Sequence, residues 1–159
     1  MTNNRKKEII FYVYSLLIIC ICVVVDMLLK KATDGKSFGL INGVLSVYST
    51  YNTGGAWSIF NDHTIALTII SALFLFAVVV MFVLYKKKNL MFNISCSLII
   101  AGAMGNLIDR IFLGYVRDFI KLDFMNFPIF NFADMCVCVG VVLLCIYMFF
   151  IEKRIKREN

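Results

Sequence analysis

The sequence predicts an all-α membrane protein with four transmembrane helices and a small extracytoplasmic β element. Of its 159 residues, 61% are hydrophobic and 16% are charged, and the mean hydropathy is +0.86. A soluble domain of this composition would expose large apolar patches. The apolar residues also fall into four runs of about 20, the length that crosses the hydrocarbon core of a bilayer. Because the chain has the length of one domain, we expect residues 1–159 to form a single integral membrane domain.

The four spans follow from the apolar runs taken in order. The first run contains one charged residue, Asp26. It is longer than the apolar part of a typical signal peptide and lacks a small-residue cleavage site, so we expect it to stay in the membrane. The second run has no charged residue and ends at three consecutive lysines. The predicted spans are approximately residues 9–29, 64–85, 90–108 and 130–151.

The segment between the first two spans predicts the β element. Asn42-Gly43 lies between two apolar pairs, which is a hairpin signal. A glycine-containing turn follows and leads to Trp57, a residue type that anchors chains at membrane interfaces. We therefore expect residues 36–60, approximately, to form a small β region on the outer membrane surface.

Lysine and arginine predict the orientation. Ten of the 16 lie in the N-terminal tail, in the loop after the second span and in the C-terminal tail. The other six are diluted over two longer segments, residues 30–63 and 109–129. Since cytoplasmic loops are enriched in lysine and arginine, both termini should be cytoplasmic and the two longer segments should face outward.

Several functional classes are disfavoured by composition. The net charge is +6, but the basic residues form no basic face of the kind that binds nucleic acid. All six cysteines lie in apolar runs without a C-x-x-C pair, which indicates small buried side chains. His63 is the single histidine, which argues against a histidine metal site or a Ser-His-Asp triad. We expect no metal and no cofactor.

Polar residues recur at one depth in three spans. Asp26 lies roughly 25 Å along the first predicted helix, and Asn106 roughly 24 Å along the third, at 1.5 Å per residue. Asn131 and Asp134 open the fourth span from the outside. Ionisable groups are costly at this depth unless they pair or serve a site. The pattern therefore predicts a carboxylate site just inside the outer interface.

Simpler interpretations of these residues remain open. Asp26 and Lys30 are four residues apart and would also fit an interfacial ion pair. Asn106 and Asp109, with Arg110 adjacent, would also fit a helix end with a solvated salt bridge, in which Asp109 is structural.

The same holds for the later polar positions. Asn131 and Asp134 fit an N-cap with an acid in the first turn, although this leaves their apolar neighbours unexplained. Asp118 would also fit a surface loop. Residues 52–57 fit a plain β-turn, or a backbone that approaches a bound peptide with Gly55 making room.

A pair of carboxylates is the strongest reactive arrangement that the sequence offers. Two aspartates close together do not both ionise easily, so one keeps its proton. The pair then supplies a base that activates water and an acid that protonates the leaving amine, as in aspartic peptidases. Asp134 is the better candidate for the ionised partner, because it lies near a predicted helix N-terminus.

Five short motifs follow one another along the chain. They are Asp26-x-x-x-Lys30, Asn52 to Trp57 with Gly55-Ala56-Trp57, Gly105-Asn106-Leu107-Ile108-Asp109-Arg110, Val116-Arg117-Asp118-Phe119, and Phe130-Asn131-Phe132-Ala133-Asp134. In this order, and combined with four spans, they resemble the bacterial lipoprotein signal peptidases (signal peptidase II) over nearly the whole length.

The resemblance implies an aspartic endopeptidase of the bacterial plasma membrane. Such an enzyme removes the signal peptide of diacylglyceryl-modified prolipoproteins, cleaving before the lipidated cysteine. Its partners would be these substrates and membrane lipids, and we expect a monomer. The resemblance assigns catalysis to Asp118 and Asp134, substrate binding and ordering of the site to Asn52, Gly55, Asn106, Arg110 and Asn131, and a supporting role to Asp26, Lys30 and Asp109.

Two positions depart from the family pattern. Met27 stands where the family usually has glutamine, and Arg117 replaces the second valine before Asp118. A cation there could lower the pKa of Asp118 or make an ion pair.

Two other functions remain as alternatives. A small transporter or proton-conducting protein is the first, although its polar residues would belong near the bilayer midplane, where this chain is apolar. A non-catalytic membrane scaffold is the second.

Overall fold

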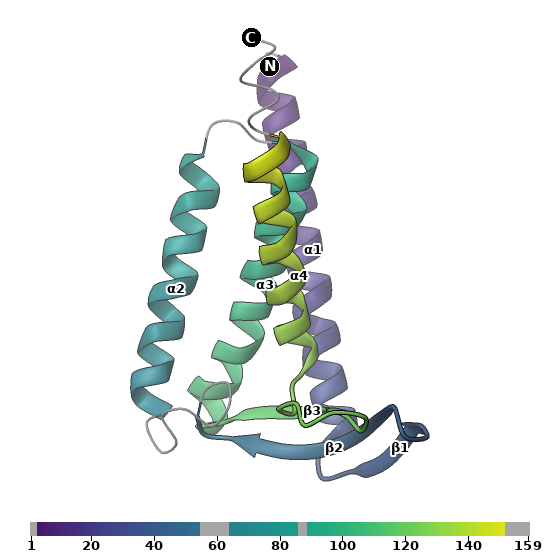
Figure 1. Cartoon of the computed structure of the whole chain (residues 1–159). Helices are drawn as coiled ribbons and strands as arrows, with labels where there is room; N and C mark the ends of the chain where they lie inside the picture. The colour runs from purple at the N-terminus through teal and green to yellow at the C-terminus, as the bar shows by residue number, and fades with distance from the viewer. Residues whose placement is uncertain (1–2, 55–63, 86–88, 152–159) are drawn as a thin grey trace.

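The computed structural model describes residues 3–54, 64–85 and 89–151. Within them, four long helices run side by side and a three-stranded sheet lies across one end, the sheet end of the bundle (Figure 1). Each helix is long and apolar enough to cross a membrane, which confirms the predicted fold class. The helices are α1 (Asn3–Thr33), α2 (Thr64–Leu84), α3 (Leu90–Leu113) and α4 (Phe132–Ile146), and α4 continues into the π-helical turn η2 (Tyr147–Ile151).

Helix α3 is the centre of the bundle and packs against the other three helices. Small residues let α4 approach it closely. A Cβ atom on Gly140 would lie 2.7 Å from Ile99 Cγ1, and one on Gly102 would collide with the carbonyl oxygen of Ala133. In a membrane, where lipid is as apolar as the side chains, such close backbone approach is a main source of helix association. These glycines therefore set the distance between α3 and α4.

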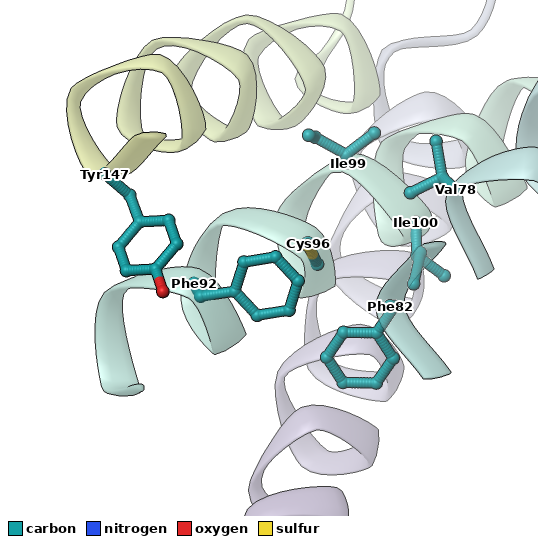
Figure 2. Close-up of a cluster of buried hydrophobic side chains, with 7 residues drawn as sticks. All are labelled: Val78, Phe82, Phe92, Cys96, Ile99, Ile100 and Tyr147. Carbon is teal, nitrogen blue, oxygen red and sulfur yellow. The ribbon is translucent and has the colours of Figure 1, made fainter. Parts of the chain in front are cut away.

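A cluster of buried apolar side chains joins the helices away from the sheet end (Figure 2). Phe92 is its centre and packs against Tyr85, with ring centroids 4.6 Å apart, and against Tyr147, at 5.5 Å. Next to it, the buried amide of Asn93 accepts hydrogen bonds from Ser15 at 2.8 Å and Ser97 at 3.1 Å. The sequence analysis did not single out this polar contact, which ties α1 to α3 inside the apolar bundle.

The sheet is antiparallel with strand order β1 (Ser37–Ile41), β2 (Leu45–Asn52), β3 (Val116–Leu122). The predicted hairpin is confirmed, because a turn at Asn42–Val44 joins β1 to β2 and Gly43 adopts a positive φ of 70°. The third strand lies outside the predicted β region, and residues 55–60 of that region lie outside the described residues.

Two helices extend further toward the sheet end than predicted. Helix α1 continues beyond residue 29, because Lys30 is buried in an ion pair rather than placed at the interface. Helix α3 continues beyond residue 108 and stops at Gly114, whose left-handed conformation places its N–H on the carbonyl oxygen of Arg110. Both extensions carry charged side chains into the region under the sheet.

Candidate active site

The predicted polar residues meet at the sheet end, where α1, α3 and α4 approach β2 and β3. Lys30 and Asn131 are fully buried, Asp26 and Asp109 are each 1% exposed, and Asp118 is 3% exposed. Buried residues of α1, α3 and β3 and the N-cap residue of α4 therefore share one cluster, and the half-buried side chains of Asn52, Asn106 and Asp134 contact it.

Asn131 is at once a helix cap and a contact between two carboxylates. The side-chain oxygen of Asn131 accepts a hydrogen bond from the backbone N–H of Asp134 at 3.0 Å. The backbone N–H of Asn131 donates to Asp134 Oδ2 at 3.1 Å, so the two residues form a capping box. Its amide nitrogen also donates to Asp118 Oδ1 at 2.6 Å. The cap interpretation is therefore correct but incomplete, because the same residue brings Asp118 and Asp134 together.

The amide side chains direct their N–H groups at these two carboxylates. Asn106 donates to Asp134 Oδ1 at 2.7 Å, and Asn52 donates to Asp118 Oδ2 at 2.9 Å. The Asn106 oxygen in turn accepts from Lys30 Nζ at 3.1 Å. Because an ammonium group can only donate, Lys30 fixes the orientation of this amide and leaves its nitrogen facing Asp134.

Lys30 also lies between two buried carboxylates. Its Nζ is 2.8 Å from Asp26 Oδ2 and 3.4 Å from Asp109 Oδ2. Asp26 Oδ1 accepts from the backbone N–H of Ala133 at 2.9 Å, which ties α1 to the first turn of α4. The pair is thus not an exposed interfacial one. Together, Lys30 and Asp26 join α1 to α3 and α4, and Lys30 is connected to Asp134 through Asn106.

Gly105 makes room for this ion pair. A Cβ atom there would lie 2.6 Å from Asp26 Oδ2 and 3.1 Å from the Cβ of Ala133. We expect Gly105→Ala to push Asp26 away from its partners and to destabilise the protein by about 1–3 kcal/mol. Thermal unfolding in detergent measures this. Gly39→Ala is the matched control, because its added Cβ meets nothing within 4 Å. Equal melting temperatures for the two variants would contradict the assigned role of Gly105.

Arg110 faces the two aspartates and the turn after β2. Its charge acts on both Asp134 and Asp118, and its Nη2 is 3.4 Å from the carbonyl oxygen of Gly54. The turn itself is held by a hydrogen bond from the Gly54 N–H to Asn52 Oδ1 at 2.9 Å. Gly55, the remaining predicted site residue, lies outside the described residues.

The two departures from the family pattern contact each other. Arg117 makes an ion pair with Asp109 at 2.7 Å, and its Nη2 lies 3.8 Å from Met27 Sδ. Of the two possibilities for Arg117, the ion pair is therefore the one that forms. The pKa of Asp118 is not lowered but raised, to about 6, because burial and the charge of Asp134 outweigh the hydrogen bonds from neighbouring amides.

An open pocket of about 1260 Å³ lies beside the cluster. Asp118 and Asp134 line its polar end, at the edge of the sheet. Its remaining walls are largely apolar and include Phe74 from α2 and Met135 from α4. This contribution of α2 could not be predicted from the sequence, because an uninterrupted apolar run has the same pattern whether it faces lipid or a pocket.

The comparisons with known proteins identify the family of the chain. The model of the family described as "Signal peptidase (SPase) II" matches residues 18–150. The lipoprotein signal peptidase of Enterococcus faecalis is 42% identical over 124 residues, covering 77% of this chain and 76% of that protein. That of Lactobacillus johnsonii is 37% identical over 158 residues, covering 95% and 99%.

Two solved structures are similar to this chain in both fold and sequence. A bacterial membrane enzyme determined by the in meso method superposes with a TM-score of 0.79 at 36% identity, covering 85% of this chain and 87% of that one. A second structure of this kind gives 0.78 at 35% identity, with 86% and 93% covered. The chain therefore belongs to the signal peptidase II family of membrane peptidases.

Proposed function

We propose that this protein is an intramembrane aspartic endopeptidase that removes the signal peptide of diacylglyceryl-modified prolipoproteins, cleaving before the lipidated cysteine. The observation that carries the proposal is the joining of Asp118 and Asp134 through Asn131 at the polar end of one pocket. Family membership supports a peptidase over a transporter or a scaffold.

In this proposal the two aspartates divide the acid and base roles. Asp118 is the acid, because burial and the charge of Asp134 raise its pKa to about 6 and favour its protonated form more than in an ordinary aspartate. Asp134 is the base; it lies in the first turn of α4 and accepts hydrogen bonds from Asn106 and from the backbone N–H of Asn131. Asp134 takes a proton from water while the water oxygen bonds to the scissile carbonyl carbon. Asp118 then protonates the amine as the C–N bond breaks.

The pocket supports an amphiphilic substrate. Its apolar walls on α2 and α4 suit a lipid chain, and its polar end suits a peptide bond next to the aspartates. Arg110 and Asn52 would order the peptide backbone there. Held by its lipid, the substrate reaches the site already oriented, which offsets much of the entropy loss of a bimolecular hydrolysis.

We place the enzyme in the bacterial plasma membrane, with both termini in the cytoplasm and the site near the outer face. In support, the beginning of α1 and the end of α4 lie together, opposite the sheet end (Figure 1). We also propose that the active form is a monomer.

Purified protein in liposomes tests this function. We expect cleavage of a diacylglyceryl prolipoprotein at the bond before its modified cysteine, and no cleavage of the same precursor without the lipid. A pH-sensitive dye inside the liposomes tests for proton conduction in the same sample. Proton flux without cleavage would overturn the proposal in favour of a transporter.

The raised pKa of Asp118 predicts a pH-dependent stability. The folded protein binds this proton more tightly than the unfolded chain, whose aspartates titrate near 3.8. The resulting stabilisation is complete below pH 3.8 and is lost as pH rises through about 6. The shift corresponds to about 3 kcal/mol.

Asp118→Asn isolates this contribution, because its neutral amide does not titrate. We expect the melting temperature of the variant, relative to the unmodified protein, to be higher at pH 8 than at pH 5. Thermal unfolding in detergent across this range measures the difference. A constant difference at all pH values would contradict the assigned titration.

A further inference from the structure

We propose that Arg117 is a positioning residue that sets β3 against α3 and thereby places Asp118 opposite Asp134. The proposal rests on the function proposed above. Neither the motifs nor the charge pattern of the sequence assigns this role to Arg117.

The contact is a clamp with three donors rather than a single ion pair. Asp109 Oδ1 accepts from Arg117 Nη2 at 2.7 Å. Asp109 Oδ2 accepts from Arg117 Nε at 3.3 Å and from the Arg117 backbone N–H at 3.0 Å. Asp109 is 1% exposed and the Arg117 side chain 17%, so water weakens the contact little. The forked guanidinium matches a carboxylate in a way that the ammonium of lysine does not.

The position of Arg117 in the strand makes this clamp matter for the site. Because the backbone N–H takes part, the clamp holds the strand itself and not only a side chain. Asp118 is the next residue, and its Cα is about 3.8 Å away across one peptide bond. Successive side chains of a strand point to opposite faces, so Arg117 can hold Asp109 while Asp118 faces Asn131.

Asp109 also connects this clamp to the other aspartate. Its Oδ2 lies 3.4 Å from Lys30 Nζ, which donates to Asn106 Oδ1, and Asn106 donates to Asp134. One buried carboxylate thus holds the strand of Asp118 on one side and the amide that orders Asp134 on the other. A displacement of β3 would change the separation of the two aspartates, and misplacement of a catalytic group by about 1 Å can cost 100-fold in rate.

The test compares Arg117→Met and Arg117→Lys with Lys121→Met. Lys121 is the matched control, because it lies on the same strand, is 46% exposed and contacts Asp123 and the ring of Tyr48 rather than the buried cluster. We expect Arg117→Met to lower kcat by about 10- to 100-fold with KM changed less than twofold. Arg117→Lys keeps the charge without the fork and should recover part of the loss, whereas Lys121→Met should behave like the unmodified protein.

Rates are expressed per folded molecule, from the fraction that survives size-exclusion chromatography in detergent. A kcat for Arg117→Met within twofold of the unmodified protein would overturn the inference. Should that variant fail to fold, full activity of Arg117→Lys would overturn it, because lysine does not reproduce the clamp.

Amide hydrogen exchange in β3 supplies a readout without substrate. We expect faster exchange in both Arg117 variants, and unchanged exchange would refute the clamp. An unmodified protein that cleaves no prolipoprotein would instead refute the proposed function.

Discussion

Asp118→Asn and Asp134→Asn are each expected to abolish prolipoprotein cleavage while the protein still folds. Each change removes either the acid or the base, and such proton transfer contributes about 10²- to 10⁴-fold to a rate. Asparagine has the same shape as aspartate and still accepts a hydrogen bond at its oxygen, so the contact from Asn131 to either position can persist. Cleavage of a fluorescent prolipoprotein in detergent measures the loss, and size-exclusion chromatography verifies folding.

Asp123→Asn is the control for this pair. It lies one residue after β3 and contacts Ser46 and Lys121 at the surface, away from the buried cluster. We expect its cleavage rate to match that of the unmodified protein. Retention of cleavage by Asp118→Asn or Asp134→Asn would remove that residue from the catalytic pair.

Lys30→Met is expected to cause the largest loss of stability. Lys30 is fully buried between Asp26 and Asp109, and its removal leaves buried carboxylate charge without its cation. Breaking a buried ion pair from one side typically costs about 3–5 kcal/mol. Thermal unfolding in detergent should show a large fall in melting temperature. Lys31→Met is the control, because the neighbouring lysine is exposed.

The double variant Lys30→Met, Asp26→Asn separates charge from packing. It removes the cation together with one of its anions, while Asp109 keeps its ion pair with Arg117. We expect it to be more stable than Lys30→Met alone, since replacing both partners of a buried pair is often tolerated. Equal stabilities of the double and single variants would mean that the loss of Lys30 acts mainly through packing, because removing one of the unpaired charges would then restore nothing.

The apolar runs predicted the four helices because membrane spans depend on length and hydropathy, which are local properties of the sequence. The helix ends were less predictable. The predicted spans ended just before Lys30 and Asp109, since a charge usually marks the interface, but both residues lie within helices and their side chains find partners at the sheet end. A boundary defined by charge fails where charges are paired inside the fold.

The third strand and the partner of Arg117 were not predicted from the sequence. Residues 116–122 are rich in β-branched and aromatic side chains, a strand signal that the neighbouring aspartate and lysine obscured. The register of β3 depends on β2, with Asp118 opposite Thr50, and this pairing joins segments far apart in the chain. The partner of Arg117 likewise follows from how α3 turns into β3 at Gly114, which composition does not determine.

The hydrogen bond between Asp26 and the Ala133 N–H has a consequence for biogenesis. It links positions separated by 107 residues, one on the first and one on the last of the long helices in the described part of the chain. A nascent chain that has inserted only α1 to α3 therefore lacks both Asp134 and the partner of Asp26. In the proposed mechanism, such a chain has no catalytic pair and should not cleave its neighbours until α4 is in place.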